Sequence, residues 1–133
     1  MVFFRSKAES VTRVLVMVPT RELGVQVFQV SKQLCQFTSV DVALSVGGLD
    51  LRLQEAALRK NPDIVIATPG RLIDHIKNTP SFGLENIEVL ILDEADRYTL
   101  RKLLVLVLNL VLDCLFDSLI SVREDLSLPL ISK

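Results

Sequence analysis

Several features that would assign this 133-residue chain to a simple functional class are missing from it. Its formal net charge of -1 gives no global basic field, so any nucleic-acid binding must be local. The two cysteines, Cys35 and Cys114, form no CxxC pair, which favours a reduced intracellular compartment over a disulfide framework. Residues 1–9 contain no apolar run of the signal-peptide kind. Hydrophobic residues make up 50% of the chain, enough for the core of one ordinary domain.

A long hydrophobic run and a phosphate-binding loop are missing as well. The apolar stretch 103–116 is shorter than the roughly 20 residues that span a bilayer. It also contains Asn109 and Asp113, so it predicts a buried or interfacial helix and no membrane span. A loop that cradles nucleotide phosphates requires Gly-x-x-x-x-Gly-Lys followed by Thr or Ser. No glycine of this chain is followed by lysine, so such a loop is not expected.

Strand-like and helix-like segments alternate along the chain. Continuous apolar runs predict four strands, at residues 14–18, 42–46, 64–67 and 89–93. Helices are predicted after Thr20, over residues 51–59, and after Thr68 and Pro69, which suit an N-cap and a first helical residue. The first and third helices have apolar faces made of Leu23, Val27, Val30, Leu34 and Phe37, and of Leu72, Ile73 and Ile76. This order predicts an α/β fold with a parallel sheet and flanking helices.

The last predicted strand ends in acidic residues, because Val-Leu-Ile-Leu at 89–92 is followed by Asp93, Glu94, Ala95 and Asp96. Four successive apolar residues predict a strand that is buried on both faces. Ligands of open α/β sheets bind at the carboxyl ends of the strands. Carboxylates there can hold a hydrated Mg²⁺ and position a water beside a nucleotide. The run favours nucleotide hydrolysis, and a solvated acidic turn after a core strand is the alternative.

Three further segments lie where phosphates could bind. Residues 19–24 (Pro-Thr-Arg-Glu-Leu-Gly) and 68–71 (Thr-Pro-Gly-Arg) each open a predicted helix. Helix starts offer free N–H groups and a positive dipole end, and each of these segments adds a guanidinium group. Gly47-Gly48 lacks side chains, so another backbone can come close. Taken singly, each segment is better explained as an ordinary cap, a turn or a solvated arginine; their joint order and spacing point to function.

In order and spacing, these four segments resemble the DEAD-box RNA helicases. They look like motif Ia, the GG motif, motif Ib and motif II of that family's first RecA-like domain. Beyond the motifs, residues 5–97 are similar to the nucleolar members that act in large ribosomal subunit assembly. The segments 46–50, 54–59 and 80–82 carry that closer likeness.

The resemblance implies a role for each matching residue. Asp93 would reach Mg²⁺ through water, Glu94 would orient and activate the attacking water, and Asp96 would link the nucleotide site to the moving parts of the domain. Four residues would contact the sugar-phosphate backbone of single-stranded RNA: Arg21, Gly48, Thr68 and Arg71. Such contacts give affinity without reading sequence. The resemblance also implies ATP and Mg²⁺ as cofactors, pre-ribosomal particles as partners, and a nuclear, nucleolar location.

The chain departs from the family pattern in several places. It has no phosphate-binding loop, no adenine-reading Q motif and no Ser-Ala-Thr motif, and it is too short for a second RecA-like domain. We therefore expect this chain alone to be inactive as an ATPase. Residues 1–97 are interpreted as an incomplete RecA-like domain, and residues 98–133 as a divergent apolar tail with a helix at 103–116. An incomplete sheet leaves an unpaired edge, so self-association is expected when the chain is expressed alone.

Three interpretations remain open. The chain is a fragment of an ATP-dependent RNA helicase, a non-catalytic module that binds RNA or a protein partner, or a non-functional truncated product that folds poorly. His75 has no second histidine or cysteine nearby in the sequence, so it is predicted to be structural or solvated. Cys35 falls on the apolar side of its predicted helix and is interpreted as a core thiol.

Overall fold

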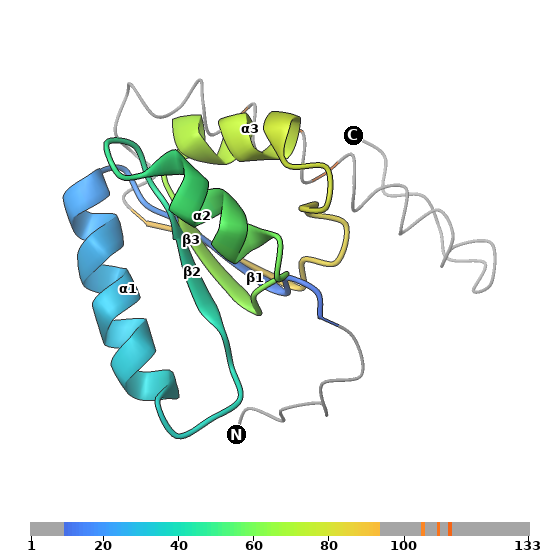
Figure 1. Cartoon of the computed structure of the whole chain (residues 1–133). Helices are drawn as coiled ribbons and strands as arrows, with labels where there is room; N and C mark the ends of the chain where they lie inside the picture. Colours follow the sequence, from blue (N-terminus) through green and yellow to red (C-terminus); the bar gives the residue numbers. More distant parts are fainter. Residues whose placement is uncertain (1–9, 94–104, 106–108, 110–111, 113–133) are drawn as a thin grey trace, which may run out of the picture.

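The computed structural model describes residues 10–93 and, beyond them, Val105, Asn109 and Leu112. Over residues 10–93, strands and helices alternate as the sequence predicts (Figure 1). The elements are β1 (Val14–Met17), α1 (Arg21–Cys35), β2 (Val42–Ser45), α2 (Leu51–Leu58), β3 (Ile64–Ala67), α3 (Pro69–Asn78) and β4 (Val89–Leu92). The α/β fold with flanking helices is therefore confirmed.

The four strands form one parallel sheet in the order β2-β3-β1-β4. Val14 is level with Ile64 of β3 on one side and with Val89 of β4 on the other. Ile64 is in turn level with Val42 of β2. Because all strands run the same way, their carboxyl ends meet at one edge of the sheet, which we call the carboxyl edge.

The core consists of two layers, one on each face of the sheet, because alternate residues of a strand point to opposite faces. Residues of β1, β2 and β3 pack on one face against α2, α3 and the segment that follows α3. The other alternate residues of these strands pack against α1. Figure 1 shows α1, in blue, apart from α2 and α3, in green and yellow. Strands β1, β2 and β3 are thus covered on both faces.

The face of α1 that contacts the sheet differs from the predicted one. Gly24 is buried, and a Cβ atom added there would lie 2.9 Å from Val46 Cγ1. Leu23 and Val27 pack as predicted, but Leu34 and Phe37 are 77% and 92% exposed. The apolar pattern misplaces the buried face because it gives no weight to glycine, whose missing side chain lets the helix approach the sheet.

The prediction that β4 is buried on both faces is wrong. Val89 and Ile91 are each 47% exposed, and Leu92 is 37% exposed. The strand lies at the end of the sheet and pairs with β1 alone among the described strands. Continuous apolar character therefore marks β4 as a strand without showing how much of it is covered.

Several predictions lie outside the described residues. They concern Glu94, Asp96, the domain boundary at residue 97 and the tail over residues 98–133. Within that tail, Val105, Asn109 and Leu112 are helical and exposed. Among the described residues, no helix is both long enough and apolar enough to cross a membrane.

Candidate nucleic-acid interface at the carboxyl edge of the sheet

Backbone hydrogen bonds join the segments that leave the strands at the carboxyl edge. The Asp93 N–H donates to the Met17 carbonyl at 3.0 Å, across β4 and β1. The N–H of Val18 donates to Ala67 at 2.9 Å, and the N–H of Thr68 donates to Ser45 at 3.0 Å. Each segment is thus tied to the end of the neighbouring strand. The first three sequence motifs consequently converge on this edge. So does Asp93, the one residue of the fourth motif that the structure describes.

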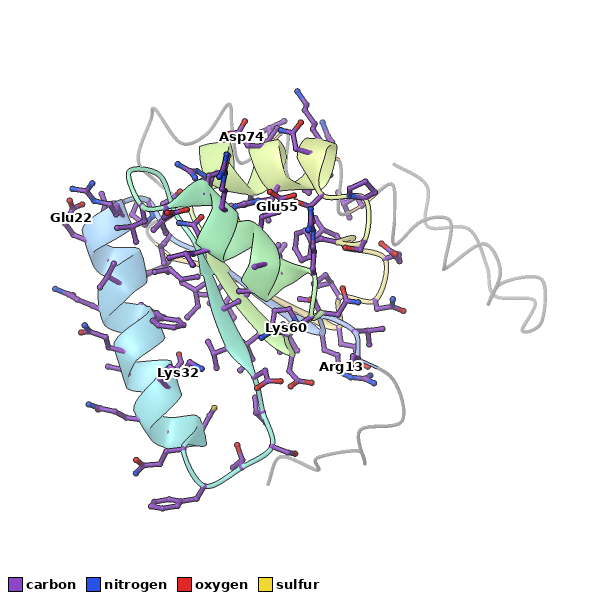
Figure 2. The ribbon with its side chains drawn as sticks, viewed as in Figure 1. Arg13, Glu22, Lys32, Glu55, Lys60 and Asp74 are labelled. Atoms are coloured by element: carbon purple, nitrogen blue, oxygen red, sulfur yellow. The ribbon has the colours of Figure 1, made fainter. Side chains whose placement is uncertain are left out.

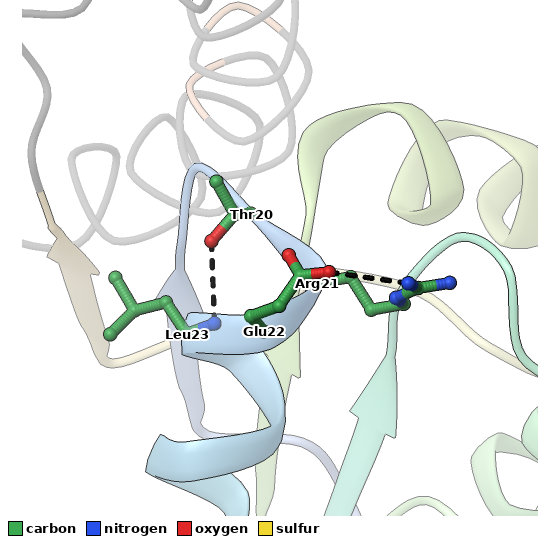
Figure 3. Close-up of polar contacts among 4 residues, drawn as sticks. All are labelled: Thr20, Arg21, Glu22 and Leu23. Carbon is green, nitrogen blue, oxygen red and sulfur yellow. Dashed lines mark hydrogen bonds and ion pairs between the residues drawn. The ribbon is translucent and has the colours of Figure 1, made fainter.

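The first of these segments opens α1. The Thr20 side chain accepts a hydrogen bond from the Leu23 N–H at 3.3 Å, which confirms the predicted N-cap (Figure 3). Arg21 Nη2 lies 3.2 Å from Glu22 Oε1, and both side chains are exposed. A backbone hydrogen bond, followed by Arg21, holds the pKa of Glu22 below its ordinary value. Thr20 is therefore occupied by its helix, and part of the Arg21 charge is offset.

The Gly47-Gly48 turn meets Arg21 from the end of β2. Gly48 has a φ of +76°, in the left-handed region that favours glycine. A Cβ atom added at Gly48 would collide with the Arg21 guanidinium. A Cβ at Gly47 would meet no atom within 4 Å. The structure therefore brings two predicted RNA-contact residues, Arg21 and Gly48, into direct proximity.

The third segment opens α3, with Pro69 at the start of the helix as predicted. Thr68 is its N-cap residue, but the Thr68 side chain makes no cap hydrogen bond. Arg71 Nη1 is removed from solvent and has no hydrogen-bond partner among the described residues. No described carboxylate forms an ion pair with Arg71. Within residues 10–93, the helix start therefore offers a hydroxyl that makes no cap hydrogen bond, helix N–H groups and a guanidinium without a carboxylate partner.

The acidic end of β4 is only partly within the described residues. Asp93 directly follows the strand and is exposed at the carboxyl edge. Among the described residues, no three histidine, cysteine or acidic side chains gather in a way that could hold a metal ion. Mg²⁺ in nucleotide sites takes one or two carboxylates together with substrate phosphates. Asp93 is suitably placed to be one such ligand, and it does not form a metal site by itself.

Two buried polar residues behind this edge were not assigned a functional role from the sequence. Gln54 of α2 is 7% exposed and His75 of α3 is 1% exposed. Gln54 Oε1 lies 3.2 Å from His75 Nε2. His75 was predicted to be either structural or solvated, and its burial confirms the structural role. Its partner is 21 residues away in sequence and carries no periodic signal of its own.

A four-stranded parallel sheet with two helices that begin at its carboxyl edge defines the class of α/β proteins that bind ligands at that edge. The family model described as DEAD/DEAH box helicase matches residues 2–111. The chain belongs to the DEAD/DEAH box helicase family. The match runs past residue 97, and the proposed boundary at that position remains a prediction.

Individual curated proteins support the same family assignment. The chain is 67% identical over 94 residues to the mouse protein named probable ATP-dependent RNA helicase DDX27, and 65% identical to the human protein of that name. It is 59% identical over 95 residues to the ATP-dependent RNA helicase DRS1 of Meyerozyma guilliermondii. Each alignment covers 71% of this chain, but only 12% of the mouse and human proteins and 14% of the Meyerozyma protein. The chain thus spans a small part of these relatives.

Solved structures agree on the fold. The yeast DEAD-box splicing factor Prp28 superposes with a TM-score of 0.69 at 30% identity, covering 75% of this chain and 24% of that one. A hypothetical ATP-dependent RNA helicase from Sulfolobus tokodaii gives a TM-score of 0.67 at 33% identity. That superposition covers 74% of this chain and 30% of the Sulfolobus chain. The described part of this chain is therefore a portion of a RecA-like helicase domain.

Proposed function

We propose that this chain is the RNA-backbone-binding part of an ATP-dependent DEAD-box RNA helicase. Arg21, Gly48, Thr68 and Arg71 would contact consecutive phosphates and sugars of a single strand. The observation that carries the proposal is the start of α3, where the Thr68 hydroxyl caps nothing and the Arg71 guanidinium has no described carboxylate partner. Polar groups that the fold leaves unused at a helix start are available to an anion.

The expected binding is weak and independent of sequence. Arg71 and Arg21 supply point charges, and helix N–H groups supply donors, none of which distinguishes one base from another. The net charge of -1 adds no long-range attraction, so affinity depends on the local contacts. Because each phosphate contact releases counterions, the logarithm of affinity should fall with the logarithm of salt by about 0.7 per contact on single strands.

The test is a fluorescence-anisotropy titration of labelled oligouridine at two salt concentrations. The variant combines Arg21→Ala with Arg71→Ala, and we expect weaker binding and a salt slope lower by about 1.4, the share of two contacts. The control combines Arg59→Ala with Lys60→Ala, which removes the same charge from the end of α2. Lys60 is well separated from Glu22, the neighbour of Arg21 (Figure 2). Equal losses in both double variants would mean that binding follows net charge rather than the carboxyl edge.

ATP hydrolysis belongs, in this proposal, to a longer protein that also contains the phosphate-binding loop. Phosphoryl transfer depends mainly on positioning and electrostatic stabilisation of the phosphates, and Asp93 and Glu94 would repel phosphate unless a metal bridges them. We expect the isolated chain to release no phosphate from ATP above background, with or without RNA. RNA-stimulated release that disappears in Glu94→Gln would contradict this expectation.

The cellular setting follows from the closer likeness to the nucleolar members of the family. We extend the proposal to pre-ribosomal particles as the RNA source and to the nucleolus as the location. The measurement is cross-linking of the tagged chain in cells, followed by sequencing of the attached RNA. Enrichment of messenger RNA over ribosomal precursor RNA would count against this assignment and would leave backbone binding unaffected.

A further inference from the structure

A buried polar connection runs between the end of β2 and α3. Gln54 Nε2 donates a hydrogen bond to the Val46 carbonyl at 2.9 Å, and Gln54 Oε1 lies 3.2 Å from His75 Nε2. Both side chains are buried, on the helices that also supply Leu58 and Leu72 to the core. Burying polar groups is unfavourable unless they are hydrogen-bonded, so this connection fixes the mutual position of three elements.

The direction of both hydrogen bonds can be assigned. A backbone carbonyl can only accept, so the amide nitrogen of Gln54 must face Val46 and its oxygen must face His75. His75 therefore donates from Nε2. Burial lowers the pKa of His75, and Arg71 lowers it further, while Glu55 and Asp74 act in the opposite direction. Neutral His75 thus carries its proton on Nε2 at pH 7.

One end of this connection supports the glycine turn. Val46 directly precedes Gly47-Gly48, and Gly47 has open space around the position of a side chain. On the far side of the turn, the Asp50 carboxylate accepts from the N–H groups of Arg52 and Leu53. The turn has no side chain of its own to anchor it, so its position depends on Val46 and Asp50.

The other end lies on the helix that carries the second RNA-contact segment. His75 and Arg71 are four residues apart in α3 and share one side of the helix. Gly48, at the opposite end, lies against Arg21. The contacts therefore lead from Arg21 through the glycine turn to Gln54 and His75, and His75 lies one helical turn from Arg71.

We propose that Gln54 and His75 are positioning residues, which hold the Gly47-Gly48 turn and Arg21 in register with Thr68 and Arg71 so that one RNA strand engages both. This inference rests on the proposed function. Neither residue touches RNA; both act through the Val46 carbonyl. Loss of the connection should weaken binding by letting the turn move, while leaving the charges of the interface unchanged.

The experiment uses the full 133-residue chain and three variants. Gln54→Met keeps the side-chain length and removes both hydrogen bonds, His75→Phe keeps a ring and removes the donor, and His75→Gln restores an N–H donor. In anisotropy titrations with oligouridine, His75→Phe should bind about fivefold more weakly, the factor expected for one lost hydrogen bond, and Gln54→Met, which loses two, should bind more weakly still. His75→Gln should bind within about twofold of the parent chain.

Two readouts separate positioning from general destabilisation. Amide hydrogen exchange at Gly47 and Gly48 should accelerate in Gln54→Met, while exchange in β1 and β3 stays unchanged. The effect of Gln54→Met on affinity should also shrink when Arg21→Ala is already present, because the displaced turn then has no Arg21 guanidinium lying against Gly48. A double-mutant cycle measures this coupling.

The inference fails if folded Gln54→Met binds as the parent chain does, or if its effect adds fully to that of Arg21→Ala. If Gln54→Met does not fold, His75→Phe and His75→Gln decide, and equal losses in these two would overturn the role of the donated hydrogen bond. Failure of the proposed function appears separately, as unchanged RNA affinity in the Arg21→Ala, Arg71→Ala double variant. Faster exchange confined to the turn in Gln54→Met would then still show that the connection holds the turn, without a role in RNA binding.

Discussion

The starts of α1 and α3 share a sequence pattern and differ in what they leave unused. Each follows a strand of the parallel sheet, and each combines threonine, proline and arginine. At α1 the Thr20 hydroxyl caps the helix and Arg21 pairs with Glu22. At α3 the Thr68 hydroxyl caps nothing, and Arg71 has no described carboxylate partner. At the start of α1 the polar side chains are thus largely bonded within the protein. At the start of α3 they remain available, among the described residues, to bind a ligand.

The difference arises from how each start is fixed. α1 depends on its cap and on the close approach of Gly24 to the sheet. α3 is fixed by the backbone, since the Thr68 N–H bonds the Ser45 carbonyl and Pro69 presets the helical φ. The Thr68 side chain is therefore not required for the helix to begin, and it can serve another purpose.

The largest expected effect concerns the two glycines of these helix starts. Gly24→Val should destabilise the fold by about 3 kcal/mol, because its side chain would overlap Val46 and Val18 in a packed core. Gly70→Val is the matched control, since a Cβ at Gly70 meets nothing within 4 Å, and it should stay within about 0.5 kcal/mol. Urea unfolding followed by circular dichroism measures both. Equal destabilisation would show that α1 is not held by close packing at Gly24.

The next effect concerns the two arginines. Arg71→Ala should weaken oligouridine binding about tenfold and Arg21→Ala about threefold, because Arg21 is already partly neutralised by Glu22. Glu22→Gln should release Arg21 from its ion pair, so that the contribution of Arg21 to affinity approaches that of Arg71. Anisotropy titrations measure the affinity of all three variants. A larger loss for Arg21→Ala than for Arg71→Ala would reverse the comparison between the two helix starts.

A smaller effect separates the two threonines. Thr20→Ala should lower stability by about 1 kcal/mol through loss of the cap, whereas Thr68→Ala should leave stability within about 0.5 kcal/mol. We expect RNA affinity to respond in the opposite way, with the larger loss in Thr68→Ala. Thermal unfolding and RNA titration of both variants provide the measurement, and a stability loss confined to Thr68→Ala would contradict the assignment.

The smallest expected effect is a dependence of stability on pH through His75. Its pKa is lower in the folded chain than in the unfolded one, mainly through burial and then through Arg71, against the opposing influence of Glu55 and Asp74. The unfolded chain therefore binds more protons below about pH 6.5, the ordinary pKa of histidine, and stability falls as the pH drops from there. Unfolding midpoints at pH 7.5 and 5.5 should differ less in His75→Gln than in the parent chain. An unchanged difference would assign the dependence to other groups.

Much of the fold follows from local sequence pattern. The four strands, the three helices and the Thr20 cap are confirmed, because apolar runs and caps are local signals. The common edge for Arg21, Gly48, Thr68 and Arg71 follows from the parallel order of the strands. Which faces are buried was harder to predict. Helix α1 packs on the sheet through Gly24, and β4 is exposed where burial was predicted.

The remaining differences depend on contacts between distant residues. The hydrogen bond between Gln54 and His75 requires α2 and α3 to be packed on the sheet before the two side chains meet. Periodicity cannot reveal a buried amide whose partner lies on another helix. For the same reason, sequence could not show that the Thr20 side chain makes a cap hydrogen bond while the Thr68 side chain makes none.

The backbone hydrogen bonds that extend past the strand ends have a mechanical consequence. Asp93 is bonded to β1, Val18 to β3, and Thr68 to β2, so each exit is anchored to the next strand across the sheet. A force applied along an RNA strand and directed along the β-strands would shear these bonds together, and would not peel one segment away first. In an optical-tweezers measurement, the carboxyl edge should therefore yield in a single step at higher force when pulled along the strands than when pulled across them.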